Sequence, residues 1–148
     1  MDSTKKTNGG FLISKIKQIQ GRVFEKLLVA HGISEFNGAQ GRILFVLWEQ
    51  DCITVSALSE KTGLAKTTLT AMLDRLEKMG HIQRTNDPAD RRSVKIILTT
   101  KAQGLKDKYD AVSAEMNKIF YGGFGDEEVL AFEAYLGRVL ENLLKKEN

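Results

Sequence analysis

Apolar residues recur at every third or fourth position along most of this chain, which is the spacing of amphipathic helices. Helices are predicted over residues 11–30, 37–49, 55–62, 66–79, 99–121 and from 126 onward. Asn37 with Gln40 forms a capping pair for the second of these helices, and Thr99 and Asp126 are positioned to cap the last two. Only residues 82–98 have the composition of a strand pair. The pattern therefore predicts a mainly helical protein with a small β-element.

Residues 54–80 predict two helices joined by a tight turn. Thr54 can cap the first helix, and Gly63 suits the left-handed position that ends it. The second helix stops at Gly80 and has two distinct faces. Its apolar stripe comprises Leu69, Met72, Leu73, Leu76 and Met79, and its opposite face carries Lys66, Thr67, Thr70, Ala71, Asp74 and Arg75.

Two strands are predicted after these helices, the outgoing Ile82–Thr85 and the returning Ser93–Leu98. One face of the returning strand is apolar: Val94, Ile96 and Leu98. The seven residues Asn86–Arg92 between the strands are too many for a two-residue hairpin turn, so this loop is expected to project. Asp90 is close enough in sequence to hold the Arg92 guanidinium in an ion pair. On a mobile surface loop, such a pair alone would contribute little to stability.

The order helix, turn, helix and ribbon is that of a winged helix-turn-helix, which places its second helix in the DNA major groove and a basic loop beside it. Small and hydroxyl side chains allow a helix to lie deep in a groove and to reach phosphates or base edges. The candidate DNA-binding residues are Lys66, Thr67, Thr68, Thr70, Ala71 and Arg75 on the helix, and Arg84, Asp90, Arg91 and Arg92 on the wing.

Two other interpretations of this segment remain open. A threonine-rich helix face can simply be solvated, and a winged helix can bind proteins without binding DNA, because a fold does not fix a function. Four basic groups expected on one exposed surface favour DNA: Lys66, Arg75, Arg91 and Arg92. A protein-binding face would favour large apolar groups at these positions.

Residues 52–100 resemble the MarR family (multiple antibiotic resistance regulators) of bacterial transcription regulators. The resemblance rests on Ile53–Leu58, Leu69–Gly80 and the run Asp87-Pro88-Ala89-Asp90-Arg91-Arg92 that leads to Leu98-Thr99. It implies that Asp90 and Arg92 brace the wing and that an arginine there enters the minor groove. It also implies an obligate homodimer on a near-palindromic operator in double-stranded DNA, acting as a repressor that a small molecule relieves.

The same resemblance suggests an effector, often a small aromatic acid bound between the dimer helices and the DNA-binding part. Val23, Phe45 and Trp48 are the candidate lining residues, although aromatic residues at this spacing are also typical of a plain core. Peroxide-sensing members of the family carry a cysteine in the first helix, and this chain has none there. Cys52, beside the short strand before the motif, is expected to be a buried and inert thiol, with a redox-sensing role as the alternative.

The helices outside the winged helix-turn-helix are expected to hold two copies together. Their apolar stripes have little core to cover within one monomer, and packing against a second copy would bury them. The predicted organisation is an N-terminal arm and dimerisation helix at 1–36, the winged helix-turn-helix at 37–99 and dimerisation helices at 100–148. A monomeric helical bundle is the alternative.

Charge supports this assignment through its distribution. The chain has a net charge of +3, residues 54–99 carry +3 and residues 126–148 carry −3, so the basic excess lies in the predicted DNA-binding segment. The single cysteine excludes an intramolecular disulfide scaffold. No apolar run is long enough for a membrane span or a signal-peptide core. A cytoplasmic protein without a membrane partner is expected.

Patterns that indicate catalysis are absent from the sequence. His31 and His81 are isolated, with no cysteine or carboxylate at metal-ligand spacing. The glycine-rich run at 122–125 follows a predicted helix, whereas a phosphate-binding loop follows a strand. No enzyme activity, metal or cofactor is therefore expected.

Overall fold

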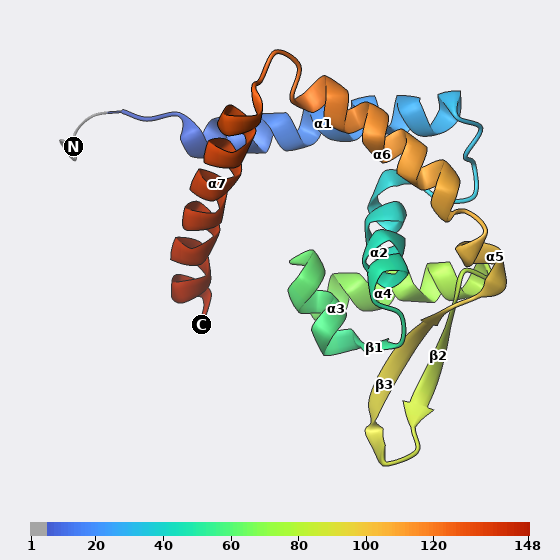
Figure 1. Cartoon of the computed structure of the whole chain (residues 1–148). Helices are drawn as coiled ribbons and strands as arrows, with labels where there is room; N and C mark the ends of the chain where they lie inside the picture. Colours follow the sequence, from blue (N-terminus) through green and yellow to red (C-terminus); the bar gives the residue numbers. More distant parts are fainter. Residues whose placement is uncertain (1–5) are drawn as a thin grey trace. The chain divides into compact units, whose positions relative to one another are not determined.

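The computed structural model of the chain describes residues 6–148, apart from the side chain of Arg91. Its helices are α1 (Gly9–Ala30), α2 (Gly38–Glu49), α3 (Val55–Thr62), α4 (Lys66–Lys78), α5 (Thr100–Gln103), α6 (Lys106–Phe120) and α7 (Asp126–Glu147) (Figure 1). Its strands are β1 (Ile53–Thr54), β2 (Ile82–Asp87) and β3 (Asp90–Leu98). The predicted fold class, mainly helical with a small β-wing, is confirmed.

Several helix ends form where the local sequence predicts them. The Asn37 side chain accepts a hydrogen bond from the Gln40 backbone N–H at 2.8 Å, and the Gln40 side chain accepts one from the Asn37 N–H at 3.0 Å. Thr54 caps α3 by accepting the Ala57 N–H at 3.1 Å. Gly63 follows α3 with φ of 74°, which is the left-handed conformation expected there.

A single hydrophobic core joins the elements between α1 and the start of α6. Its innermost side chains, each at most 1% exposed, are Leu28, Ile43, Leu44, Leu47, Leu58, Leu69, Leu73, Leu76, Ile82, Ile96 and Val112. Helix α4 contributes Leu69, Leu73 and Leu76 to this core, so the spacing of its apolar residues fixes which face remains outside. Each fully buried leucine of this kind stabilises the fold by roughly 1.5–3 kcal/mol.

The three strands form one antiparallel sheet in the order β1–β3–β2. Ile53 lies opposite Ile96, and Ile82 lies opposite Leu98. Asp51 anchors the sheet at its base, because its carboxylate accepts the Leu98 N–H at 2.9 Å. The buried residues of the sheet pack on the helical core, and β2 and β3 extend beyond it as the wing (Figure 1).

The single helix predicted over residues 99–121 is wrong, because it is broken into α5 and α6 at Gly104-Leu105. Thr99 caps the first part as expected, accepting the Ala102 N–H at 3.2 Å. The Leu105 N–H then bonds to the Ala102 carbonyl three residues earlier, at 3.1 Å, which tightens the turn. Gly104, a weak helix former, stands at this break.

The predicted cap at Asp126 is also wrong by one residue. Gly125 occupies the N-cap of α7, and its N–H donates to the Glu128 carboxylate at 2.9 Å. Asp126 is the first helical residue instead. The acidic run at the start of α7 still places negative charge at the positive end of the helix.

The chain divides into two compact units, residues 6–113 and residues 114–148, with the boundary inside α6. In the second unit the rings of Phe120, Tyr121, Phe124 and Phe132 contact one another around the turn before α7. The Tyr121 hydroxyl donates to Glu133 at 2.5 Å, and this bond raises the pKa of Tyr121.

Large apolar side chains are exposed on the two longest helices. On α1 they include Phe11 at 71% and Leu12 at 51%, and on α7 they include Leu130 at 71% and Leu143 at 63%. No residue of α7 is buried. Within residues 6–148, no helix combines the length and hydropathy needed to cross a bilayer.

Candidate nucleic-acid interface

The outer face of α4 is exposed along its whole length. Leu69, Leu73 and Leu76 face the core and Met72 packs against it, so the opposite side of the helix points outward. The structure leaves exposed all six helix residues that the sequence singles out: Lys66, Thr67, Thr68, Thr70, Ala71 and Arg75. This face carries hydroxyl, methyl and basic groups and no large apolar side chain, which suits a polar groove better than a protein core.

The N-terminus of α4 lacks a side-chain cap. Ala65 occupies the N-cap and has no hydrogen-bonding side chain, so the first N–H groups of the helix receive no bond from the cap residue. The exposed Lys66 stands at the same end. A helix start with available N–H groups and an adjacent ammonium favours an anion such as a phosphate.

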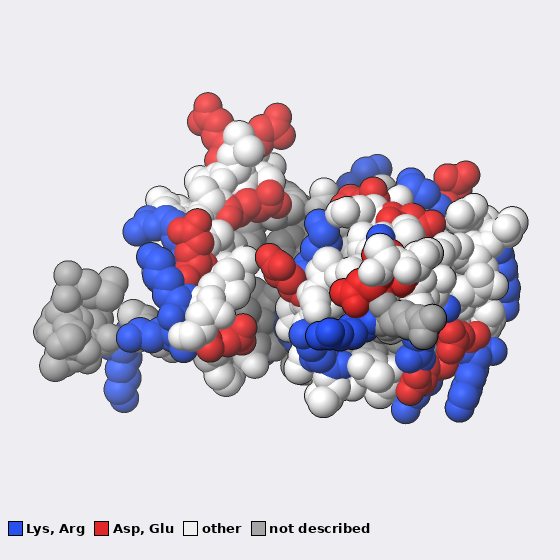
Figure 2. All heavy atoms as spheres, turned by 90° about the horizontal axis from the view of Figure 1, so that it is seen from below, with Lys and Arg blue, Asp and Glu red and all other residues white. Residues whose placement is uncertain are grey.

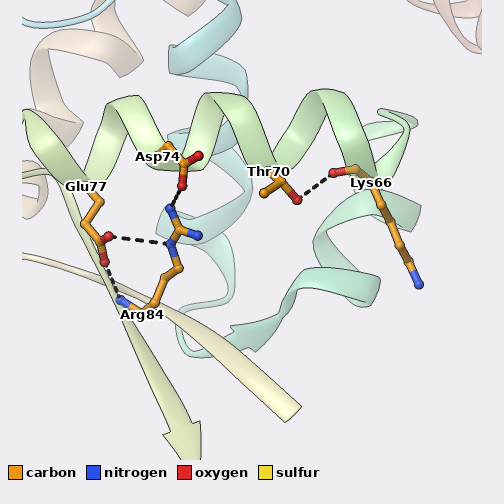
Figure 3. Close-up of polar contacts among 5 residues, drawn as sticks. All are labelled: Lys66, Thr70, Asp74, Glu77 and Arg84. Atoms are coloured by element: carbon orange, nitrogen blue, oxygen red, sulfur yellow. Dashed lines mark hydrogen bonds and ion pairs between the residues drawn. The ribbon is translucent and has the colours of Figure 1, made fainter. Parts of the chain in front are cut away.

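The Thr70 hydroxyl is already engaged within α4. It donates to the Lys66 carbonyl at 2.7 Å (Figure 3). Its oxygen lone pairs remain available, so Thr70 can accept a hydrogen bond from a partner while it keeps this bond.

The tip of the wing is a two-residue turn, and the predicted seven-residue loop over 86–92 is wrong. Strand β2 continues to Asp87 and β3 begins at Asp90, so only Pro88-Ala89 connects them. The Asp87 carboxylate accepts the Ala89 N–H at 2.9 Å, which closes the turn through a side chain. Beyond it the register is irregular: Asp87 lies opposite Asp90, while Asn86 lies opposite Val94.

This irregularity leaves residues 91–93 of β3 without a partner on β2. The expected ion pair between Asp90 and the Arg92 guanidinium is not formed. The Asp90 carboxylate instead accepts the backbone N–H of Arg92 at 3.0 Å, while the Arg92 side chain is exposed. Asp90 therefore fixes the main chain that carries Arg92, and the guanidinium remains available. The expectation for Arg91 concerns a side chain outside the described part of the structure.

Arg84 lies at the root of the wing and contacts α4 instead of pointing away from it (Figure 3). Its guanidinium donates to the Asp74 carboxylate, its Nε lies 3.7 Å from a Glu77 carboxylate oxygen, and its backbone N–H donates to Glu77 at 3.2 Å. We call Arg84, Asp74 and Glu77 the helix–wing clamp. The sequence predicts Arg84 as a DNA-binding residue of the wing and does not predict this contact. The feature that could have indicated it is the acidic pair Asp74 and Glu77, one helical turn apart on α4.

Charges of both signs occur on the side of the molecule where the wing ends. Figure 2, which looks at the molecule from below, shows Lys and Arg side chains interspersed with Asp and Glu side chains. Two of the acidic groups, Asp74 and Glu77, are paired with Arg84. Residues 54–99 carry eight Lys or Arg and five Asp or Glu residues, so their net +3 is a small excess over mixed charges.

One pocket includes a single member of the candidate effector set, Phe45. A pocket of about 390 Å³ is lined by Phe45, Val46, Glu49, Gln50 and Lys61, so it includes neither Val23 nor Trp48. The Trp48 indole N–H donates to the Ala102 carbonyl at 3.1 Å, and its ring lies 5.1 Å from that of Tyr109. Trp48 therefore ties α2 to α5, while Phe45, 40% exposed, borders the pocket.

Cys52 and His81 are two further residues whose side chains could carry chemistry. Cys52 is exposed, not buried as expected, and has a left-handed φ of 57°. His81 is fully buried, and its Nε2 lies 2.9 Å from the Glu35 carbonyl. Within residues 6–148, no three His, Cys, Asp or Glu side chains are grouped so that they could hold a metal ion.

Comparison with known sequences finds relatives for most of the chain. The MarR family model matches residues 36–94. The transcriptional regulator PapX of Escherichia coli is 38% identical over 120 residues, which cover 76% of this chain and 73% of PapX. The transcriptional regulator TtmR of Methylorubrum extorquens is 40% identical over 92 residues, but this chain spans only 46% of TtmR.

Comparison with solved structures extends the likeness to nearly the whole chain. A cysteine-to-serine mutant of E. coli MarR, crystallised with operator DNA, has a TM-score of 0.79 and 27% identity, covering 88% of this chain and 92% of that one. CouR of Rhodococcus jostii, bound to p-coumaroyl-CoA, has a TM-score of 0.75 and 25% identity, covering 88% and 90%. The likeness therefore extends beyond the residues that the family model matches.

Proposed function

The chain belongs to the MarR family, and we propose that it is a sequence-specific DNA-binding transcription regulator, a dimeric repressor relieved by a small molecule. The observation that carries this proposal is the exposed, hydroxyl-rich and basic face of α4 beside a wing whose tip presents Arg92. The solved relative with operator DNA supports it. We assign the protein no catalytic step and place it in the cytoplasm, where its DNA is.

The proposed roles of the side chains follow from their places. Thr70, Ala71 and Arg75, midway along the outer face of α4, contact base edges in the major groove. Lys66, Thr67 and Thr68, at the uncapped start of the helix, hold a phosphate. On the wing, Arg91 and Arg92 enter the minor groove or bind its phosphates, and Asp90 positions them through the main chain.

The second proposed partner is another copy of the same chain. Two copies are expected because α1 and α7 expose large apolar side chains that one copy leaves in water. A homodimer would bury these faces and present two reading heads related by a twofold axis. Such a dimer reads a near-palindromic operator.

The proposed effector is a small aromatic or amphipathic molecule. Among the predicted lining residues, Phe45 borders the pocket on α2, and Lys61 of α3 on its rim offers a cation. The relative bound to an aromatic acyl-CoA supports effector control in this fold. Because the pocket joins α2 to the helix-turn-helix, an occupant there would change the position of α3, and with it that of α4.

The proposal is tested by selecting DNA fragments from the source genome with the purified full chain and sequencing those retained. We expect enrichment of fragments that share an inverted repeat, in which footprinting places protection. Recovery of fragments with no shared sequence would contradict a sequence-specific regulator.

Variants of α4 then separate base reading from phosphate binding. Arg75→Ala and Thr70→Ala should weaken operator binding more than random-DNA binding, by on the order of 1–3 kcal/mol per good base contact. Lys66→Ala is the matched control, since loss of a phosphate contact weakens both kinds of DNA alike. Equal losses on operator and random DNA for all three variants would assign Arg75 and Thr70 to the backbone.

A further inference from the structure

The angle between the wing and α4 depends on contacts at the root of the wing, where the helix–wing clamp lies. Asp74 and Glu77 are three residues apart on α4 and so share one face. Arg84 reaches both carboxylates from β2, and its side chain is 26% exposed, against 54% for Asp74 and 45% for Glu77. The guanidinium is thus the most enclosed member of the clamp.

Two kinds of contact hold Arg84 in place. The guanidinium donates a hydrogen bond to Asp74, and the backbone N–H of the same residue donates to Glu77 at 3.2 Å. The buried Nε lies 3.7 Å from a Glu77 oxygen and forms no hydrogen bond, so Glu77 acts on the guanidinium through charge. Side chain and main chain of β2 are therefore attached to α4 together. One hydrogen bond from the side chain and one from the main chain restrict Arg84 more than either bond alone would.

The attachment at the root determines where the tip of the wing lies, because a small rotation at the root displaces the tip. Asp87 at the tip is three residues beyond Arg84 along β2, which corresponds to roughly 10 Å at about 3.3 Å per residue. A rotation of about 10° at the root would move the tip by about 2 Å, a large part of the width of a minor groove of about 6 Å. Asp90 fixes the main chain at the tip, and only a contact at the root can fix the direction of the whole ribbon.

We propose that Arg84 is a positioning residue: it holds the wing at a fixed angle to α4 by binding Asp74 and Glu77, and it does not itself contact DNA. This inference rests on the proposed DNA-binding function. It also explains why α4, which is proposed to approach phosphates, carries the carboxylates of Asp74 and Glu77. Arg84 offsets one of their two negative charges, so they anchor the wing at a smaller electrostatic cost than two unpaired carboxylates would carry.

The clamp and a direct phosphate contact predict opposite results for one variant. Asp74→Asn/Glu77→Gln removes two negative charges and leaves Arg84 intact. If Arg84 were a DNA ligand, this change would free its guanidinium and tighten binding with a steeper salt dependence. If Arg84 positions the wing, the same change weakens operator binding, because the wing loses its anchor.

The experiment measures operator affinity and, on the DNA-free full chain, hydrogen exchange of residues 82–98. Arg84→Ala and Asp74→Asn/Glu77→Gln should both accelerate exchange in the wing and lower operator affinity by about tenfold. A tenfold change corresponds to about 1.4 kcal/mol, shared between two clamps in a dimer, which is within the range of partly exposed ion pairs. Arg84→Lys should restore the charge but only part of the affinity.

Lys95→Ala is the matched control. Lys95 is another wing cation, 35% exposed, but its partner is Asp87 of the wing itself, 3.8 Å away, and not α4. Its loss should have a smaller effect on operator affinity than loss of Arg84. Circular dichroism of each variant checks that the helices are retained.

Two results would overturn the proposal: unchanged exchange in the wing of both clamp variants, or tighter operator binding by the acidic double variant. A wild-type chain that retains no DNA would overturn the proposed function instead. In that case the exchange measurement alone still decides whether Arg84 fixes the wing.

Discussion

Asp90 offers the sharpest test at the tip of the wing, because its expected effect is opposite to simple charge counting. Its carboxylate accepts the Arg92 N–H at 3.0 Å and so holds the main chain that presents the Arg92 side chain. Removing the carboxylate also removes a negative charge near DNA. Charge counting predicts that Asp90→Ala binds DNA more tightly, whereas the main-chain bond predicts that it binds more weakly.

The magnitude follows from counterion release. If each Arg92 neutralises one phosphate, Arg92→Ala lowers the slope of log affinity against log salt by about 0.9 per site and about 1.8 per dimer. Raising the salt from about 50 mM to about 200 mM then weakens wild-type binding about 12-fold more than it weakens the variant. Asp90→Ala should share part of this loss, because its Arg92 is present but no longer held.

The assay is a salt series of operator binding for the wild type, Arg92→Ala, Asp90→Ala and Asp90→Asn. Asp90→Asn is the matched control, since its amide oxygen can still accept the Arg92 N–H while the charge is gone. We expect Asp90→Asn to bind at least as tightly as the wild type and Asp90→Ala to bind more weakly. If both Asp90 variants bind more tightly, the main-chain bond has no part in DNA binding.

Three further outcomes are expected. Gly41→Ala should lower the free energy of unfolding in urea by about 1–3 kcal/mol, because its new Cβ would lie 2.7 Å from the Tyr109 ring and 3.0 Å from that of Phe36. Gly21→Ala is the control and should be tolerated, since a Cβ there meets nothing within 4 Å. Burial raises the pKa of Tyr109, while Ser113 and Arg42 oppose this shift. The free energy of unfolding should therefore be unaffected by Tyr109 below its unfolded pKa of about 10 and should fall as the pH rises through the folded pKa. Tyr109→Phe should remove this part of the alkaline loss, measured as the denaturation midpoint against pH. A chain ending at residue 125 lacks the apolar face of α7 and should sediment as monomer or aggregate without operator binding; a soluble truncate with full affinity would contradict the dimer.

Features set by neighbouring residues could be predicted from the sequence. The caps at Asn37 and Thr54, the left-handed Gly63 and the buried stripe of α4 all depend on contacts within about one helical turn. For this reason the helix-turn-helix and the exposed residues of its outer face agree with expectation.

Features that depend on contacts between side chains far apart in the sequence could not be predicted from it. The wing turn is shorter than expected because Asp87 and Asp90 replace missing backbone partners with carboxylate bonds. The role of Arg84 depends on a contact between a helix and a strand, which hydrophobic periodicity does not report. Trp48 was grouped with Phe45 by spacing on one helix, but its indole binds the Ala102 carbonyl, a partner 54 residues away in the chain.

In the proposed complex, two copies of this chain are held rigidly together, and each places α4 and the wing on one half of an operator. The decisive measurement compares the affinity of the full chain for its selected operator with that for the same operator carrying about five extra base pairs between the half-sites, which is about half a helical turn. As a control, an operator with the same number of central base pairs exchanged but no change in spacing should keep most of its affinity. We expect the insertion to reduce binding to the level of random DNA. An inserted operator that binds as tightly as the original would contradict the rigid dimer.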